Sequence, residues 1–473
     1  MDGGRGLGGG SVTANPSRAR NRTLDFARMS GREASIRRLW LAAIFLFALA
    51  VRAVFLFGVF PNAPRLVPGL YTAVGMSFDG YDAIARQLLR GHGFRLEVGA
   101  PPTAARAPLY PLLLAGIYRV FGTGVAPVLW THALLGAVTC ALLFLAGCRT
   151  FGRSTGIAAG LLFALFPPHL WWSQYVLSET LLVTLIVATF LAVVGVVQNP
   201  TGGRAAAAGA LFGLTALCNA TILFLPFALL AATAAFRELR RSYLQHGLTL
   251  LLGMAVIVLP WTGRNFIDFH RVIPINWSVG LQYMKGLVMA DDFVSRRGRN
   301  LGDLDDSSMV EIVRILRAHG HARGDFDGQL YEMRSSQTVG LEDDDLLKRL
   351  ALERVRKEPW LAVRKFVLNL GLYWFLSNRL MVVNQVVNFG LLALALLGLA
   401  FGAWRRLEAR VLLAFCLYFW LVYAWIIVSA RFALQIAPFL TLLAASAIVT
   451  LARRPRGAGG APAVAGAQNP PRA

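Results

Sequence analysis

The chain has 473 residues, of which 56% are hydrophobic and 15% are charged, and its mean hydropathy is +0.55. These values exclude an ordinary soluble enzyme. Runs of about 20 apolar residues also recur, and each can cross a bilayer as a helix. In a soluble protein the net charge of +22 would suggest nucleic acid as a partner. Here the arginines cluster beside the apolar runs, which favours orientation by the positive-inside rule and contact with anionic lipid heads. We therefore predict an all-α polytopic membrane protein that does not bind nucleic acid.

The N-terminal part contains a basic tail and the first span. Residues 1–38 are rich in glycine, serine and arginine, which predicts a disordered cytoplasmic tail. The apolar run at 39–60 is too long for a signal-peptide core and no small-residue cleavage site follows, so it is predicted to be an uncleaved span. Arg52 lies inside this run, where a charge is costly. We expect its side chain to reach the interface; a role in a pocket is the alternative.

Residues 61–124 are predicted to form an external loop, in which the apolar stretch 108–121 lies along the interface as a helix. The next spans are predicted at residues 125–148, 155–170, 178–197, 205–220, 221–236 and 245–262. They complete an N-terminal transmembrane region at 39–262. Arginines on every second connection support this topology. Residues 205–236 form either two short spans or one pair of helices that enters from the same side.

The C-terminal part begins with a polar segment, residues 263–378, which is predicted to be a second external loop. It contains a helical pattern at 342–357, a break at Pro359 and an amphipathic stretch at 360–374 that is expected to lie at the membrane surface. Spans at 380–403, 409–428 and 433–451 form a C-terminal transmembrane region at 379–451. Residues 452–473 are predicted to be a disordered cytoplasmic tail. The total is about ten transmembrane helices with both termini inside.

Metal and disulfide signals are weak. The four cysteines lie in or beside apolar runs and form no CxxC pair, so neither a disulfide framework nor a zinc site is predicted. His92 and His169 lack the partners expected of metal ligands. We expect no cofactor, and the sequence leaves open a divalent cation held by one carboxylate with water and phosphate.

Four motifs occur in order along the chain. The first runs from Asp79 to Phe94 as D-x-Y-x-x-I-A-x-x-L-L-x-G-x-G-F and is followed by R-A-P-L-Y-P from Arg106. The others are L-S-E-T-L-L at 177–182, P-W-T-G-R-N at 260–265 and A-R-F-A-L-Q-I-A-P at 430–438. Together they resemble the dolichyl-phosphate-mannose protein mannosyltransferase-like family of the GT-C glycosyltransferases, to which the aminoarabinose transferase of lipid A is related. The resemblance covers most of residues 40–450.

The resemblance implies that a loop aspartate activates the acceptor and that the donor is a polyprenyl-phosphate sugar. Asp79 is the expected base, and its alternative role is the N-cap of a helix that begins near Tyr81. Asp82 is the second candidate base, or else a solvated carboxylate in the first helical turn. Family members place the Asp farther before the Tyr, which leaves the choice between Asp79 and Asp82 open.

Several further residues are candidates for substrate binding. The leaving phosphate needs cations, and those expected near it are Arg106, Arg264, Lys285 and Arg431. The alternative for each is a side chain that reaches the membrane interface. Glu179 begins a predicted span; it is either a site residue or a carboxylate stabilised by the helix dipole.

The expected function is an inverting membrane glycosyltransferase of the plasma (inner) membrane. It would transfer a sugar from a polyprenyl-phosphate donor to a hydroxyl of a lipid, glycan or protein acceptor at the external face. Membrane lipids are the expected surroundings. The alternative is a secondary transporter or lipid flippase, which would need ionisable residues near the bilayer midplane and broken helices. A non-catalytic assembly protein that retains the fold is a third reading.

Overall fold

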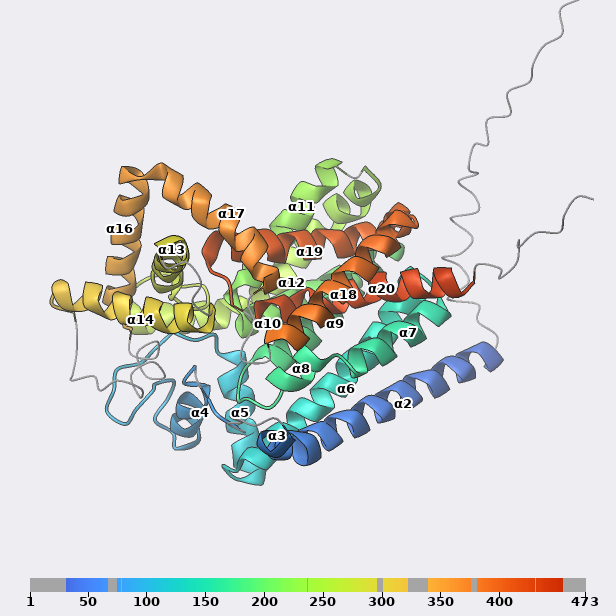
Figure 1. Ribbon diagram of the computed structural model, residues 1–473, viewed down its shortest axis with the longest axis horizontal. Helices are drawn as coiled ribbons and strands as arrows, with labels where there is room; N and C mark the ends of the chain where they lie inside the picture. Colours follow the sequence, from blue (N-terminus) through green and yellow to red (C-terminus); the bar gives the residue numbers. More distant parts are fainter. Residues whose placement is uncertain are drawn as a thin grey trace, which may run out of the picture. The chain divides into compact units, whose positions relative to one another are not determined.

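The computed structural model describes residues 31–66, 75–77, 79–235, 237–295, 301–321, 339–375, 381–429 and 431–453. Over these residues the chain forms helices and connecting turns, with no strand (Figure 1). It divides into two compact units. Unit 1 takes its described residues from 1–142 and 173–277, and unit 2 takes its own from 143–172 and 278–473. Of the predicted tails at 1–38 and 452–473, residues 1–30 and 454–473 lie outside the described residues.

Unit 1 contains the first half of the apolar helices and the helices of the predicted first external loop. They are α2 Gly31–Ala53, the π-helix η1 Val54–Val59, α3 Phe60–Leu66, α4 Tyr81–Leu89, α5 Leu109–Phe121, the part of α6 Val125–Thr150 up to residue 142, α9 Glu179–Gln198, α10 Gly202–Cys218, the 3₁₀ helix η2 Ala220–Phe224, α11 Leu225–Ala235 and α12 Arg237–Phe269.

Unit 2 contains the end of α6 and the remaining helices. They are α7 Arg153–Ala164, α8 Pro167–Trp172, α13 Val279–Ser295, α14 Leu301–Ala318, α16 Leu341–Lys357, α17 Pro359–Phe375, α18 Met381–Ala400, the 3₁₀ helix η3 Ala403–Arg405, α19 Leu407–Ile426, the 3₁₀ helix η4 Phe432–Gln435 and α20 Ala437–Ala452.

Five stretches of described helix are long and apolar enough to cross a membrane. They are Gly31–Ala63, Val125–Thr150, Glu179–Gln198, His246–Phe269 and Leu407–Ile426. Shorter apolar helices are Leu109–Phe121, Gly202–Cys218, Ala220–Ala231, Gln385–Ala400 and Ala437–Ala452. The predicted class, an all-α integral membrane protein with many spans, is therefore confirmed.

Several helix limits differ from the predicted spans. The first helix begins at Gly31, within the predicted tail, because residues 31–38 continue its helical pattern. The predicted span at 155–170 is divided: α7 ends at Ala164 and the short α8 begins at Pro167, since proline favours the first position of a helix. In the opposite direction, α12 continues through Pro260 to Phe269, so the P-W-T-G-R-N motif is helical and not part of a loop.

Small residues let helices of unit 1 approach closely. A Cβ at Gly209 would lie 1.9 Å from the Leu250 carbonyl oxygen, and one at Gly253 would lie 2.4 Å from that of Ala206. With Gly213 on the same face of α10, these glycines form the small-xxx-small contact that brings membrane helices together without a hydrophobic driving force. The pairing of α10 with α12 thus follows from residues that hydropathy alone does not distinguish.

Arg52 is enclosed between α2 and α6. Its side chain is fully buried, and its guanidinium donates to the Ala48 carbonyl one turn earlier on α2. A Cβ at Gly136 of α6 would lie 2.1 Å from Nε of Arg52, so only glycine leaves room for this side chain. The expectation that Arg52 reaches the interface is therefore wrong: the glycine on α6 opens a space for it inside the protein.

In unit 2, four helices of the predicted second loop pack around one another. Leu287 of α13, Ile312 of α14 and Leu347 of α16 are fully buried in one cluster that also includes Leu361 of α17. The chain bends sharply between α16 and α17 at Glu358, before Pro359 (Figure 1). The helices predicted at 342–357 and 360–374 are therefore present, and α13 and α14 complete their core.

Candidate active site

Asp79 lies directly before α4, in the segment predicted to carry the base. The residue that precedes the helix is Gly80, whose φ of 75° is left-handed, a conformation that glycine adopts readily. The N-cap position of α4 is therefore held by Gly80 and not by Asp79, and Gly80 has no side chain with which to cap the helix.

Arg106 holds the Asp79 segment by two contacts. Its Nε donates to the Asp79 carbonyl oxygen at 2.8 Å, and one of its terminal nitrogens lies 3.6 Å from the Asp79 carboxylate. The two side chains are only 10% and 15% exposed. This partly buried ion pair, with a guanidinium bound to backbone and carboxylate together, fixes the carboxylate more firmly than an exposed pair would.

Tyr81 connects this ion pair to the start of α9. Its hydroxyl lies 3.3 Å from the Ser178 hydroxyl, next to Glu179, and its ring meets the Tyr110 ring edge-on. Burial raises the pKa of Tyr81 far above its ordinary range; the charge of Asp79 raises it further, Arg106 lowers it and Glu179 raises it. Asp79, Arg106 and Glu179 thus surround one buried phenol, and the structure brings these three predicted site residues together.

A buried histidine, His132, contacts Tyr110 and so supports the same group of residues. His132 of α6 lies 2.8 Å from the Ser173 carbonyl through Nδ1 and 2.9 Å from the Tyr110 hydroxyl through Nε2. A carbonyl can only accept, so Nδ1 carries the proton and Nε2 accepts from Tyr110. This chain of hydrogen bonds fixes Tyr110, and Tyr110 packs against Tyr81.

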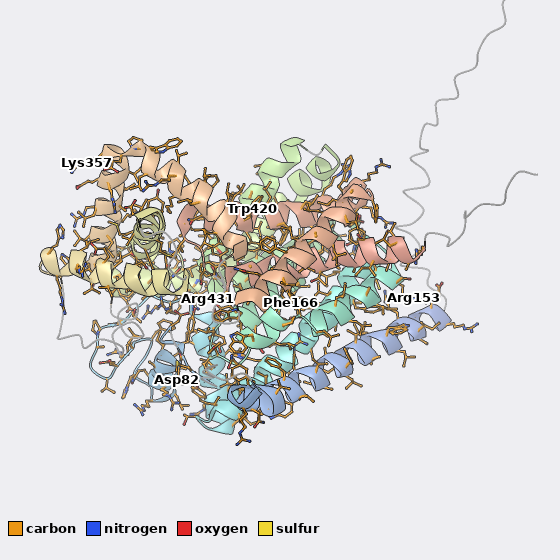
Figure 2. All side chains as sticks on the ribbon, in the orientation of Figure 1. Asp82, Arg153, Phe166, Lys357, Trp420 and Arg431 are labelled. Carbon is orange, nitrogen blue, oxygen red and sulfur yellow. The ribbon has the colours of Figure 1, made fainter. Side chains whose placement is uncertain are left out.

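Asp82 has a different environment. One carboxylate oxygen accepts from the Tyr118 hydroxyl at 2.5 Å and the other from Nε of Arg86 at 2.7 Å. Tyr118 belongs to α5, so Asp82 joins α4 to α5; Figure 2 shows its position on α4. Both oxygens of Asp82 are therefore engaged by protein donors.

Arg264 binds the loop between Phe94 and Thr103. It donates to the Thr103 carbonyl at 2.9 Å, pairs with Asp268 at 2.8 Å and stacks 4.9 Å from the Trp261 ring centroid. Because Arg106 follows Thr103 by three residues, Arg264 supports the segment that carries Arg106.

Lys285 and Arg431 belong to unit 2. Lys285 lies on α13 and is half-buried, and the Arg431 guanidinium lies 5.8 Å from the Phe432 ring centroid at the start of η4. Their meeting with Asp79 around one ligand remains a prediction.

Two polar residues beside this group escaped the sequence analysis. Gln174 is fully buried, and Ser77 lies two residues before Asp79. Neither occurs in a recognisable motif. Only the residues around Gln174 could have drawn attention to it. A glutamine is unusual in a buried turn, and this one lies in the aromatic stretch 171–175.

The described residues contain no cluster of three or more His, Cys, Asp or Glu side chains that could hold a metal ion. A divalent cation held by one carboxylate with water and phosphate stays a possibility that the sequence raises.

Part of the chain matches a known protein family. Residues 105–262 match the model of the family described as dolichyl-phosphate-mannose-protein mannosyltransferase. No curated protein matches the sequence significantly.

Among solved structures, the chain is similar to the oligosaccharyltransferase AglB of Archaeoglobus fulgidus in complex with an inhibitory peptide and a dolichol-phosphate. The identity is 15% and the TM-score 0.54, over 88% of this chain and 50% of that one. An oligosaccharyltransferase of the same organism tethered to an acceptor peptide gives 14% and 0.52, over 87% and 49%. ArnT of Cupriavidus metallidurans bound to undecaprenyl phosphate gives 17% and 0.40, over 87% and 78%.

The chain spans about half the length of the oligosaccharyltransferases that it matches. At such low identity, the likeness to them shows the fold alone. The family match lies in the region that includes Arg106, Glu179 and α6. The chain is an integral membrane protein whose fold is similar to that of these oligosaccharyltransferases, and its residues 105–262 match the dolichyl-phosphate-mannose-protein mannosyltransferase family.

Proposed function

We propose that the protein is a membrane glycosyltransferase that transfers a sugar from a polyprenyl-phosphate carrier to an acceptor hydroxyl at the external face. The observation that carries the proposal is the partly buried Asp79–Arg106 pair beside Tyr81 and Glu179, within a GT-C fold. The acceptor is a lipid, glycan or protein. The donor class is supported by the dolichol-phosphate bound to the similar oligosaccharyltransferase of Archaeoglobus fulgidus.

The chemistry assigns one task to each side chain. Asp79 accepts the proton of the acceptor hydroxyl as its oxygen attacks the anomeric carbon, and the bond from that carbon to the phosphate breaks on the opposite face. The phosphate leaves with the electron pair, so the configuration inverts. Arg106 orients Asp79 through its contacts with the backbone carbonyl and the carboxylate of that residue. In unit 1, Arg264 supplies positive charge for the leaving phosphate.

Asp79 is preferred over Asp82 as the base because of the partners of Asp82. Both oxygens of Asp82 accept from protein donors, one from Tyr118 at 2.5 Å and the other from Arg86 at 2.7 Å. A general base must have a carboxylate oxygen that can accept the proton of the acceptor hydroxyl. Asp82 instead acts as a structural connection between α4 and α5.

The proposed location is the plasma (inner) membrane, with both termini in the cytoplasm and the Asp79 segment outside. The arginines after alternate spans support this orientation. Cysteine accessibility at residue 79, measured from each side of sealed vesicles, tests it directly.

Two matched variants test the assignment of the base. Asp79→Asn should lower sugar transfer by about 10²- to 10⁴-fold, the usual contribution of a general base, while the protein inserts and folds normally. Asp82→Asn should lower thermal stability and leave transfer by the folded protein largely intact. Transfer is measured with purified protein in detergent, from a panel of undecaprenyl phosphates that each bear one sugar. Full activity of Asp79→Asn would remove Asp79 from the mechanism.

A further inference from the structure

Two segments distant in sequence lie side by side at the candidate active site. The Gly75 amide donates to the Gln174 carbonyl at 2.9 Å, and the Val176 amide donates to the Met76 carbonyl at 3.0 Å. Ser77 and Asp79 follow on the first segment, and Glu179 follows on the second. The Tyr81–Ser178 contact continues the pairing. Residue 174 is therefore placed beside the segment that carries Asp79.

Buried polar atoms without partners lie on both segments. Gln174 is 0% exposed, and neither its amide oxygen nor its amide nitrogen has a hydrogen-bond partner among the described residues. The Ser77 hydroxyl oxygen is likewise buried and unpartnered within that part of the chain. Native proteins retain few such atoms, because each loses its hydrogen bonds to water on folding. Two residues of this kind within one paired segment call for an explanation by function.

The chemistry of these atoms identifies what they can bind. A carboxamide offers one acceptor and two donor hydrogens, and a serine hydroxyl both donates and accepts. Neither carries charge, so they match neutral hydroxyl groups better than a phosphate, which is bound by cationic side chains. A sugar carries several hydroxyl groups close to the carbon that reacts.

We propose that Gln174, with Ser77 as a second contact, binds sugar hydroxyl groups at the Asp79 site and selects which sugar is accepted. The inference rests on the proposed function and deepens it. The sugar belongs to the donor or to a glycan acceptor, and the chemistry of recognition is the same for both. Residues 75–77 and 173–178 are turns or extended chain, so parting them to admit a hydroxyl breaks no helix.

The first test measures stability. Gln174→Met keeps the side-chain volume and removes an amide that has no partner in the described protein, so the thermal unfolding midpoint should stay the same or rise. The matched control is Gln87→Met. Gln87 is also buried, but its Oε1 lies 2.8 Å from Nδ1 of His92, so this variant should unfold at a lower temperature. A fall in Gln174→Met as large as that in Gln87→Met would show that a protein partner binds the amide and would overturn the proposal.

The second test measures binding by the purified full chain in detergent. The probes are undecaprenyl phosphate, a panel of undecaprenyl phosphates bearing one hexose or pentose, and methyl glycosides as acceptors. Gln174→Met should bind the preferred sugar-bearing carrier about tenfold more weakly, as expected for the loss of one to two hydrogen bonds. Its affinity for undecaprenyl phosphate itself should stay within twofold. Ser77→Ala, a change too small to prevent folding, should give a smaller loss in the same direction.

The outcomes separate the two sources of sugar and the two proposals. A loss confined to sugar-bearing carriers assigns Gln174 to the donor, and a loss confined to methyl glycosides assigns it to the acceptor; both support the inference. Unchanged affinity of both variants for every sugar-bearing probe overturns it while leaving the glycosyltransferase proposal intact. Failure of the natural protein to bind any carrier lipid overturns the proposed function itself.

Discussion

Lys365 offers a quantitative test of how unit 2 is held together. It lies on α17, is 1% exposed, donates to the Trp425 carbonyl at 2.6 Å and lies 3.4 Å from the Tyr283 ring centroid. Asn369, one turn later, donates to the Ala424 carbonyl at 3.0 Å. Together they donate to carbonyl oxygens in the last turn of α19. These oxygens have no N–H partner within the helix because the helix ends there.

The location of this lysine makes stability depend on pH. Burial lowers the pKa of Lys365 from its ordinary 10.5 to about 7. Between those values the unfolded chain binds a proton that the folded protein does not, so stability rises as the pH increases from about 7 to 10.5. Below pH 7 the full penalty applies; at about 1.4 kcal/mol per pKa unit it reaches at most about 5 kcal/mol.

We expect Lys365→Met to abolish this dependence, so that the stability difference between the variant and the natural protein changes sign with pH. The variant removes the penalty but loses a hydrogen bond worth about 1–3 kcal/mol. At pH 6 it should therefore be more stable than the natural protein by roughly 2 kcal/mol, and at pH 10 it should be less stable by about 1 kcal/mol. The assay is unfolding of the purified protein in detergent, followed by tryptophan fluorescence at both pH values.

The control is Lys357→Met at the exposed end of α16 (Figure 2). It should change stability by less than about 0.5 kcal/mol, as is usual for surface substitutions, and equally at both pH values. A Lys365→Met effect of the same sign and size at pH 6 and pH 10 would refute the reasoning, because the lysine would then be neutral or charged in both states alike.

Two further substitutions test helix contacts in the two units. Gly136→Ala should lower stability by about 1–3 kcal/mol because the added methyl overlaps the enclosed Arg52 side chain; in the Arg52→Ala background the same change should cost clearly less, and equal costs in both backgrounds would argue against the contact. Asp344→Ala should lower stability by about 1–2 kcal/mol, since Asp344 accepts from the Gly280 and Leu281 amides at 3.1 and 2.8 Å and so caps α13. Thermal unfolding checks both, and an unchanged midpoint for Asp344→Ala would exclude the cap as a source of stability.

The spans were predictable because their signal is local. The apolar run predicted at 125–148 is α6, Val125–Thr150, and that at 178–197 is α9, Glu179–Gln198. Each run is continuous, and transfer from water to lipid is decided residue by residue. The helix at 342–357 was equally clear, since its periodic leucines are followed by Pro359.

Helix ends within the spans, and close contacts between the spans, were harder to predict. The end of α7 at Ala164 and the continuation of α12 through Pro260 depend on neighbouring helices, which decide whether a proline starts, kinks or ends a helix. The burial of Arg52 depends on Gly136, 84 positions later in the sequence. No hydropathy window contains both residues.

For the site, the kinds of group could be predicted from the sequence: a loop carboxylate, a following arginine and a glutamate at the head of a span. Motif spacing indicates these groups because each lies in a short stretch of neighbouring residues. It could not separate Asp79 from Asp82, which lie three residues apart on the same stretch. Their difference arises from Arg106, Arg86 and Tyr118, partners that only folding brings to them.

The tertiary structure alone decided what surrounds Asp79. Gln174 lies beside the Asp79 segment because two backbone hydrogen bonds place residues 75–76 against residues 174–176, nearly a hundred positions later. Arg264 became a support for the loop before Arg106 for the same reason. Hydropathy and helix signals act between neighbours in sequence, whereas hydrogen bonds and ion pairs act between neighbours in space.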